Sequence, residues 1–563
     1  MSRRRHVPVW GAVAALVAAG LIATFALTSA GSGPGGTRSA TSDTSGVAPS
    51  PEPFPQVTAD AGDWLASFPD VQVTHRLAWG PTLEQWAAAQ ADARSMSLED
   101  AAGQVIVAAW NSTDAEGAAA LVSDLNLGGV ILMGGAIDTA TQVSALTDKI
   151  HAAGGDRDWG TIIGVDEEGG SVARLGGVIP TMPGFMSAGA ASDKESVTDA
   201  YAGQGADLQS LGFTTDYAPV ADVTAGLSDP TIRSRSAGSN PERVAATVDA
   251  AVAGYVSSGI VPVIKHFPGH GSVDVDSHQG LPVQKKTLAQ LETTDIVPFR
   301  DAVDAGVPGV MMAHLVVSEW GGEAASVNPN AYEYLRDELG FTGLAMTDAL
   351  NMAALQSNHS PGEAAVAALA AGADVLLLPP DPRAARDAIV AAVTSGDVPR
   401  ARLDSAVARM IVAGRWQERL ASEAEARNAE APETYARDLT VAGATVAAES
   451  CTAPWIGDSV RVVGGTESDR AHLTAALSER GVTVAGSGTS IGLLGGDSSA
   501  LNADIVVALA GPWGLQSSTA TTYVGIYGRS SEAFAGLVDV LTGSAPPGGQ
   551  WPVSLELPYD TCE

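Results

Sequence analysis

The sequence predicts an α/β protein in which a (β/α)8 barrel of the TIM type is followed by a smaller α/β sandwich domain. Short apolar runs alternate with alanine-rich helical stretches eight times in the middle of the 563-residue chain. This alternation is typical of a parallel barrel, because each strand needs a helix to return to the same end of the sheet. Five further apolar runs alternate with helices near the C-terminus and indicate the second unit.

The expected strands are short and leave room for a helix between neighbours. In the barrel they are 105–109, 130–133, 161–165, 213–219, 261–265, 309–314, 343–348 and 374–379; in the second unit they are 460–464, 482–485, 491–494, 505–508 and 523–527. Helices are expected at 244–257, 360–371, 405–416 and 470–480, and Ser97 with Asp100 predicts a capped helix start before the first strand.

The N-terminus predicts export. Arg3, Arg4 and Arg5 precede an apolar run over 7–30, which fits either a cleaved signal peptide or an uncleaved membrane anchor. No cysteine lies near the run, so lipid attachment there is excluded. The expected organisation is 1–30 signal or anchor, 31–56 flexible linker, 57–95 an extension packed on the barrel through Trp64, Trp79 and Trp86, 96–418 catalytic barrel, 419–450 connector and 451–563 C-terminal domain.

Composition excludes some partners and suggests a crosslink. The formal net charge of −33 argues against binding nucleic acid or anionic lipid. The two cysteines, Cys451 and Cys562, lack the spacing of a metal or redox motif. Because they flank the second domain and the chain is expected to be exported, we expect a disulfide between them.

The stretch 261–283, VPVIKHFPGHGSVDVDSHQGLPV, concentrates chemistry at the end of a buried strand. Lys265 and His266 suit a ligand rich in hydroxyl groups. Asp276 and His278, two residues apart, can pair to give an oriented imidazole that moves protons near neutral pH. Zinc bound by His266, His270 and His278 is the alternative, but no HExxH or CxxC spacing supports a metal.

Other strands also end in polar residues, and this convergence at one face indicates an active site. The third strand is followed by Asp166, Glu167, Glu168 and Arg174, the fourth by Asp222, Arg233 and Arg235, the sixth ends at His314 and the seventh at Asp348. In the second unit, GLLGGDSS lacks a P-loop lysine, so nucleotide binding is not expected.

Three motifs resemble one family. KHFPGHG followed by DSH, and LRDELGFTGLAMTDALN ending the seventh strand, are similar to glycoside hydrolase family 3, in its β-N-acetylhexosaminidase branch, and GSAPPGGQWPVSLELP resembles the end of its two-domain members. The resemblance implies that Asp348 is the nucleophile, His278 the acid/base and Asp276 its partner. It places Asp166, Arg174, Arg235, Lys265, His266 and His314 at substrate-binding positions. One departure is Ser171, where the family often has arginine.

The function that this resemblance implies is a retaining exo-β-N-acetylglucosaminidase acting on peptidoglycan-derived glycans or muropeptides. We expect an extracellular or cell-surface monomer, with a possible membrane tether and without cofactor or metal. A β-N-acetylglucosaminide phosphorylase, a β-glucosidase of the same family and a non-catalytic cell-wall binding protein remain as alternatives.

Overall fold

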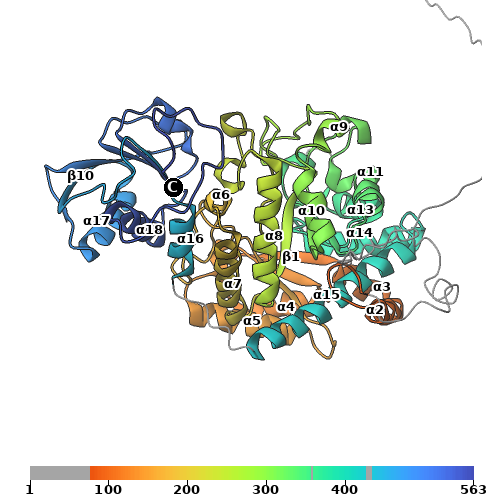
Figure 1. Cartoon of the computed structure of the whole chain (residues 1–563). Coiled ribbons are helices and arrows are strands. Elements are labelled where there is room, and N and C mark those ends of the chain that lie inside the picture. The colour runs from red at the N-terminus through yellow and green to blue at the C-terminus, as the bar shows by residue number, and fades with distance from the viewer. Residues whose placement is uncertain (1–75, 357–358, 427–433, 563) are drawn as a thin grey trace, which may run out of the picture. The chain divides into compact units, whose positions relative to one another are not determined.

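The first of two sheets is an eight-stranded parallel barrel (Figure 1). The computed structural model describes residues 76–356, 359–426 and 434–562. The strand order is β7-β6-β5-β4-β3-β2-β1-β8, and a parallel bridge between Met346 and Val375 joins β7 to β8. The strands are β1 Ile106–Trp110, β2 Gly129–Leu132, β3 Ile162–Val165, β4 Thr215–Asp216, β5 Val261–Phe267, β6 Gly309–Met312, β7 Leu344–Thr347 and β8 Leu376–Leu377.

All eight predicted barrel runs contain a strand, so the predicted fold class is confirmed. Two strands, β4 and β8, have only two residues each and are much shorter than predicted. β4 ends before Pro219, which has no backbone N–H to donate to a neighbouring strand. β8 ends before Leu378, whose φ of 46° turns the backbone out of the extended conformation.

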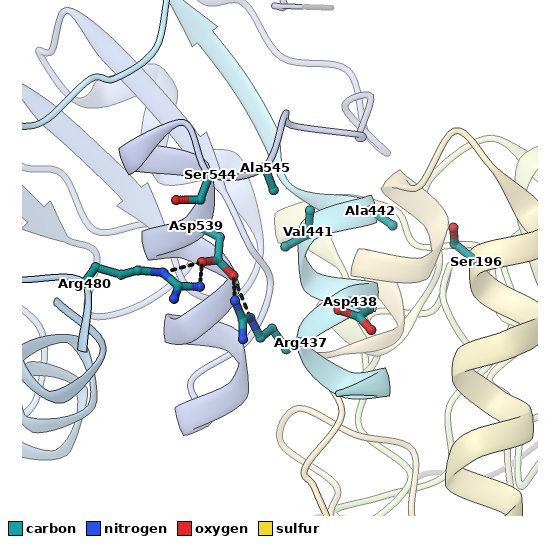
Figure 2. A pocket seen from close by; sticks show the side chains of 9 residues that line it. All are labelled: Ser196, Arg437, Asp438, Val441, Ala442, Arg480, Asp539, Ser544 and Ala545. Atoms are coloured by element: carbon teal, nitrogen blue, oxygen red, sulfur yellow. Dashed lines mark hydrogen bonds and ion pairs between the residues drawn. The ribbon is translucent and has the colours of Figure 1, made fainter. Parts of the chain in front are cut away.

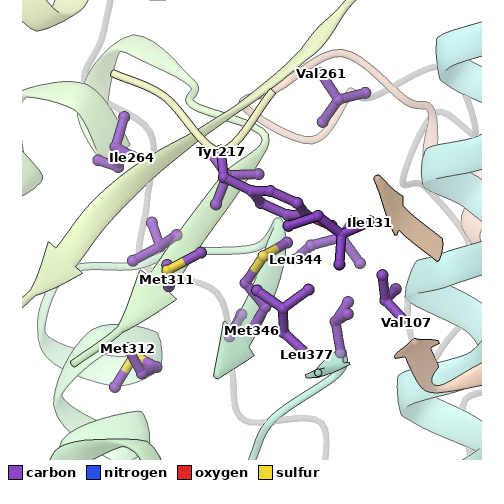
Figure 3. Close-up of a cluster of buried hydrophobic side chains, with 14 of the residues drawn as sticks. Val107, Ile131, Tyr217, Val261, Ile264, Met311, Met312, Leu344, Met346 and Leu377 are labelled. Atoms are coloured by element: carbon purple, nitrogen blue, oxygen red, sulfur yellow. The ribbon is translucent and has the colours of Figure 1, made fainter. Parts of the chain in front are cut away.

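The barrel interior is a packed apolar core rather than a channel. Figure 3 shows side chains from different strands meeting inside it, among them Val107, Ile131, Met311 and Leu344 around the ring of Tyr217. Such layers of side chains fill barrels of this kind and leave the strand ends free to carry a site.

Helices surround the sheet, and most begin at a capping residue. Ser97 caps the helix before β1, as predicted: its hydroxyl accepts the Asp100 N–H and donates to the Asp100 carboxylate. The longer helices here are α2 Leu83–Ser95, α3 Leu98–Gln104, α4 Ala115–Leu125, α5 Ala140–Ala153, α7 Lys194–Ser210, α8 Pro241–Ser257, α10 Val297–Ala305, α13 Pro361–Ala371, α14 Pro382–Ser395 and α15 Arg400–Ala426.

Before the barrel, the described part of the N-terminal extension packs on α15. The Trp79 ring meets that of Trp416 edge to face with centroids 5.2 Å apart, and the Arg409 guanidinium lies 5.1 Å from the Trp86 ring. Both tryptophans therefore serve packing, as predicted. Trp64, the expected signal or anchor and the linker lie outside the described residues. None of the described helices is long and apolar enough to cross a bilayer.

The second sheet has six strands in the order β11-β10-β12-β13-β14-β9. The sequence predicted five of them and missed β9, which pairs antiparallel with β14. β9 reads Thr-Val-Ala-Ala, and its alanines carry little strand propensity, so only pairing reveals it. The bounds are β9 Thr445–Ala448, β10 Ser459–Gly464, β11 Thr483–Val484, β12 Thr489–Leu493, β13 Ile505–Ala508 and β14 Thr522–Gly525, with helices α16 Tyr435–Gly443, α17 Glu467–Glu479 and α18 Ser531–Thr542.

The predicted disulfide is present. Cys451 and Cys562 are bonded with their Cα atoms 5.3 Å apart. Just before Cys562, Thr561 bridges Ala447 of β9, and the Cys562 N–H donates to the Val446 carbonyl at 2.7 Å. The last described residues thus close the sheet beside β9.

The barrel loops contact the second domain directly. The Gly184 N–H donates to the Tyr527 carbonyl at 2.8 Å, and Arg233 lies 3.4 Å from the Asp497 carboxylate. Met186 and Ala190 share a buried apolar cluster with Trp513, Tyr527 and Val553. The second domain therefore packs against the loops that follow β3 and β4.

Candidate active site

A cavity of about 300 Å³ lies at the carboxyl ends of the barrel strands. Its walls combine charged groups with apolar side chains. The residues that line it are Met133, Asp166, Glu168, Val172, Arg174, Thr231, Ile232, Arg235, Lys265, His266, His270, Ser277, His278, Met311, Asp348, Ala349, Asn351, Met352, Leu377 and Leu378. Seven of the nine predicted catalytic and binding residues are in this set; Asp276 and His314 are not.

Lys265, from β5, is the centre of a balanced ion network. Its ammonium lies 2.8 Å from the Asp166 carboxylate and 2.6 Å from that of Glu168. Glu168 also accepts two hydrogen bonds of 2.8 Å from the Arg235 guanidinium. Burial opposes charge here, but the opposite charges hold the pKa of Glu168 below its ordinary value and that of Lys265 above it. Glu168 and Lys265 therefore stay ionised.

Asp222 fixes two histidines from below. Its carboxylate accepts hydrogen bonds from Nδ1 of His266 at 2.7 Å and from the backbone N–H of His270 at 2.6 Å. Asp222 is fully buried, yet the two imidazoles and these donors keep its pKa below the ordinary value. With Nδ1 engaged, His266 presents its other ring nitrogen to the cavity.

Asp348 follows β7 and one of its oxygens, Oδ1, accepts the Ala349 N–H at 2.7 Å. Burial raises the pKa of the carboxyl, but the imidazoles of His314 and His266 and the Lys265 ammonium outweigh it, so that the pKa lies below its ordinary value. Asp348 is therefore an anion in the wall of the cavity.

The structure places His314 behind the cavity rather than in its lining. Its ring is fully buried, with Nδ1 2.6 Å from the Ser326 hydroxyl and Nε2 2.9 Å from the Ala349 carbonyl. Both nitrogens are thus used inside the protein. This differs from the substrate-binding position predicted for it, because the ring turns toward Ser326 after β6 has ended.

His278 and Asp276 form the predicted pair at the mouth of the cavity. His278 Nδ1 lies 2.8 Å from Asp276 Oδ1, which also accepts the His278 backbone N–H at 2.9 Å. The hydrogen bonds from His278 hold the pKa of Asp276 below its ordinary value against a burial effect that raises it. An ionised Asp276 only accepts, so Nδ1 carries the proton and Nε2 is left for chemistry.

Glu167 points away from the cavity, unlike its neighbours Asp166 and Glu168. One oxygen accepts the backbone N–H groups of Arg174 and Leu175 at 2.6 and 2.9 Å. Burial raises the pKa of Glu167 to about 7. This carboxyl fixes the turn that carries Arg174, whose Nε atom is buried and has no hydrogen-bond partner among the described residues.

These strand ends and motifs match one known family. The model of the glycosyl hydrolase family 3 N-terminal domain covers residues 97–413, which is 317 of the 563 residues. The chain belongs to glycosyl hydrolase family 3. Family 3 membership makes it a glycoside hydrolase, as the motifs predicted.

Two relatives are named beta-hexosaminidases. The Beta-hexosaminidase LpqI of Mycobacterium tuberculosis is 36% identical over 325 residues, covering 56% of this chain and 82% of that protein. The Beta-hexosaminidase A of Pseudoalteromonas piscicida is 33% identical over 283 residues, covering 46% of this chain but only 47%, about half, of that protein.

One solved family 3 structure matches more of the chain. A β-N-acetylglucosaminidase from Paenibacillus sp. str. FPU-7 superposes with a TM-score of 0.71 at 26% identity, covering 82% of this chain and 99% of its own. That coverage exceeds the barrel, so the likeness extends into the second domain.

A second cavity, of about 420 Å³, has no comparable chemistry. Figure 2 shows Arg437 and Arg480 both directed at Asp539, with nitrogen–oxygen distances of 2.6 and 2.8 Å. Asp438 adds a second acid to the wall, so the two charges of each sign balance. Its charged groups are thus partnered or balanced.

Zinc remains unsupported by the geometry. His266, His270 and His278 bind Asp222, Ser277 and Asp276 respectively, through one ring nitrogen each. Within the described ranges, no group of three or more His, Cys, Asp or Glu side chains is placed to hold a metal ion.

Sequence reasoning gave no role to three residues of this family 3 site. Glu168, Asp222 and Ser277 were noted only as polar residues that follow strands. Their roles depend on which side chain each one meets. The signal available in the sequence was the pairing of acids with bases across different strand ends, which only the barrel topology resolves.

Proposed function

We propose that this family 3 enzyme is a retaining exo-β-N-acetylglucosaminidase, which releases terminal β-linked N-acetylglucosamine from peptidoglycan-derived glycans. One observation carries the proposal: an oriented, exposed histidine, His278, lines the same cavity as the anionic carboxylate of Asp348. The names of the similar proteins, hexosaminidases and an N-acetylglucosaminidase, support the choice of sugar.

Asp348 is the nucleophile in this proposal. Its carboxylate is ionised and attacks the anomeric carbon, forming a covalent glycosyl-enzyme while the bond to the leaving oxygen breaks. Only one of its oxygens accepts the Ala349 N–H, so the other is available for attack. His314, buried behind, keeps the following residue in place through the Ala349 carbonyl.

His278 is the acid and then the base. Asp276 accepts the Nδ1–H and stabilises the imidazolium, whose Nε2–H protonates the leaving oxygen; the neutral ring that remains then removes a proton from water at Nε2. A histidine in this role also avoids placing a second carboxylate beside the carboxylate of a muramic acid leaving group. This favours peptidoglycan fragments as substrates.

The ion network binds the sugar. Lys265, Arg174 and Arg235 donate to hydroxyl oxygens and Asp166 accepts from hydroxyl groups, which orients the anomeric carbon toward Asp348. Because Lys265 and Arg235 are already paired with Asp166 and Glu168 within the protein, the network needs little rearrangement on binding.

We further propose that the enzyme works outside the cytoplasm. The disulfide between Cys451 and Cys562 supports this, because such bonds persist in oxidising compartments. Fractionation of the native host, with the bond assayed by thiol labelling, tests the location. Release into the medium or retention on membranes distinguishes cleaved from anchored forms.

The activity is tested with aryl β-N-acetylglucosaminide and aryl β-glucoside side by side, with and without phosphate. We expect faster hydrolysis of the first, β-N-acetylglucosamine as the first-formed anomer by NMR, and no sugar phosphate. Preference for the glucoside would make the enzyme a β-glucosidase, and phosphate-dependent product would make it a phosphorylase. A covalent fluorosugar adduct located by peptide mass spectrometry should fall on Asp348; Asp374→Asn, a change at the far end of the barrel, should leave labelling intact.

A further inference from the structure

The loop that carries His278 has one side chain at its tip that turns inward. His278 is 64% exposed and its partner Asp276 is 22% exposed in their side chains. Ser277, between them, is only 2% exposed. The two residues assigned to proton transfer therefore flank a buried serine.

Ser277 meets a fixed histidine. Its hydroxyl lies 3.0 Å from Nε2 of His270, which is itself 2% exposed. The His270 backbone N–H donates to Asp222, the same carboxylate that holds His266. The inward hydroxyl is thus anchored to the sugar-binding floor of the cavity.

The rest of the loop is fixed at its base. Ser272 donates to Asp295 at 2.5 Å and accepts from Gln284 at 2.9 Å, and the Gln284 N–H donates to the Val316 carbonyl at 2.8 Å. Among the described residues, the other hydrogen bonds made by 276–280 stay within the loop. The contact between Ser277 and His270 is what ties the tip to the barrel.

We propose that His270 and Ser277 form a latch that sets the position of His278 over the cavity, a role that rests on the proposed function of His278. Both are positioning residues: neither transfers a proton. Without the latch, the tip remains attached at its base while Nε2 of His278 moves relative to the leaving oxygen. A displacement of about 1 Å costs as much as a hundredfold in rate for a positioned catalytic group.

The latch predicts a leaving-group signature. Activated aryl groups depart with little protonation, whereas poor leaving groups depend on the acid. Ser277→Ala should therefore lower kcat/KM by about tenfold or more for a glycan or alkyl glycoside and by less than about threefold for a 2,4-dinitrophenyl glycoside.

Ser326→Ala is the matched control, because Ser326 also bonds a buried histidine, with its hydroxyl 2.6 Å from His314 Nδ1. That pair lies behind Asp348 and not on the loop. Its loss should affect both substrates to a similar extent. An equal loss on both substrates in Ser277→Ala would overturn the latch.

A second variant tests the partner. His270→Gln should give the same signature, and the double variant should add little to Ser277→Ala, since one hydrogen bond is removed in both. Additive losses in the double variant would also overturn the latch. His278→Ala separates the two proposals: if it lacks the leaving-group signature, the acid assignment fails, and if it shows the signature while Ser277→Ala does not, only the latch fails.

Discussion

The two ends of the barrel each hold a buried ion cluster. The two clusters differ in whether their hydrogen-bond donors and acceptors face a cavity or are used within the protein. At the catalytic end, Lys265 and Arg235 balance Asp166 and Glu168. At the other end, Asp374, just before β8, faces three guanidinium groups, those of Arg336, Arg402 and Arg409.

The cluster at the amino end has most of its donors satisfied despite its excess positive charge, although the Arg409 Nε atom is buried without a hydrogen-bond partner among the described residues. Arg336 donates to the carbonyls of Phe341 and Gly343 at 2.9 and 2.7 Å, and Arg402 donates to that of Leu369 at 3.0 Å. Burial and the neighbouring guanidinium of Arg409 lower the pKa of Arg336 to about 9, which leaves it charged at neutral pH. At the amino end, main-chain carbonyls thus accept hydrogen bonds from the arginine side chains. At the catalytic end, the corresponding donors face a cavity. A charge cluster marks a site only where donors and acceptors remain available.

The largest expected effect separates the ends by activity. Asp348→Asn should lower kcat by about a thousandfold or more, because the covalent intermediate cannot form. Its thermal midpoint should stay near that of the parent protein. Steady-state kinetics and calorimetry on the same preparation measure both, and turnover near the parent rate would end the nucleophile assignment.

The next effect separates the ends by stability. Asp374→Ala leaves three buried guanidinium groups without their carboxylate, which should cost about 3–5 kcal/mol of the free energy of unfolding. Activity at low temperature should persist, since Asp374 does not line the cavity. Urea unfolding followed beside activity makes the comparison. A stable but inactive variant would show that the amino end contributes to catalysis.

A smaller effect compares two arginines. Arg174→Ala should lower kcat/KM by about tenfold to a hundredfold while the free energy of unfolding stays the same. The reason is that the Arg174 Nε atom has no hydrogen-bond partner among the described residues. Arg402→Ala should do the reverse, because that side chain bonds Asp374 and main-chain carbonyls. If Arg174→Ala were the less stable of the two, Arg174 would be structural.

The last effect concerns pH and the layer below the cavity. Burial raises the pKa of Asp216 to about 8, so the folded protein holds a proton that the unfolded chain has lost above about pH 4. The contribution of Asp216 to the free energy of unfolding therefore falls as the pH rises from about 4 to 8. Asp216→Asn lacks that loss, so its stability relative to the parent should improve across this window. A constant difference between pH 5 and pH 8 would show that Asp216 is ionised in the fold.

Features that depend on a short stretch of sequence could be predicted. The runs before Lys265 and Asp348 are apolar and end abruptly in polar residues, so strand, strand end and candidate roles follow from one stretch each. The direction of a side chain does not follow in this way. Glu167 and Glu168 are adjacent, yet one fixes a backbone turn and the other lines the cavity. His314 ends a predicted strand as Asp348 does, yet both of its ring nitrogens are hydrogen-bonded inside the protein, to the Ser326 hydroxyl and the Ala349 carbonyl.

β9 is the feature with consequences beyond the fold. The second sheet needs a strand that precedes it in the chain, β9, and a bridge from Thr561, which is made almost at the last described residue. A ribosome that stops after Cys451 but before Thr561 leaves β9 without this bridge and Cys451 without its disulfide partner. Chains truncated in this range therefore carry a free thiol, and a thiol-reactive resin would separate them from chains that contain Cys562.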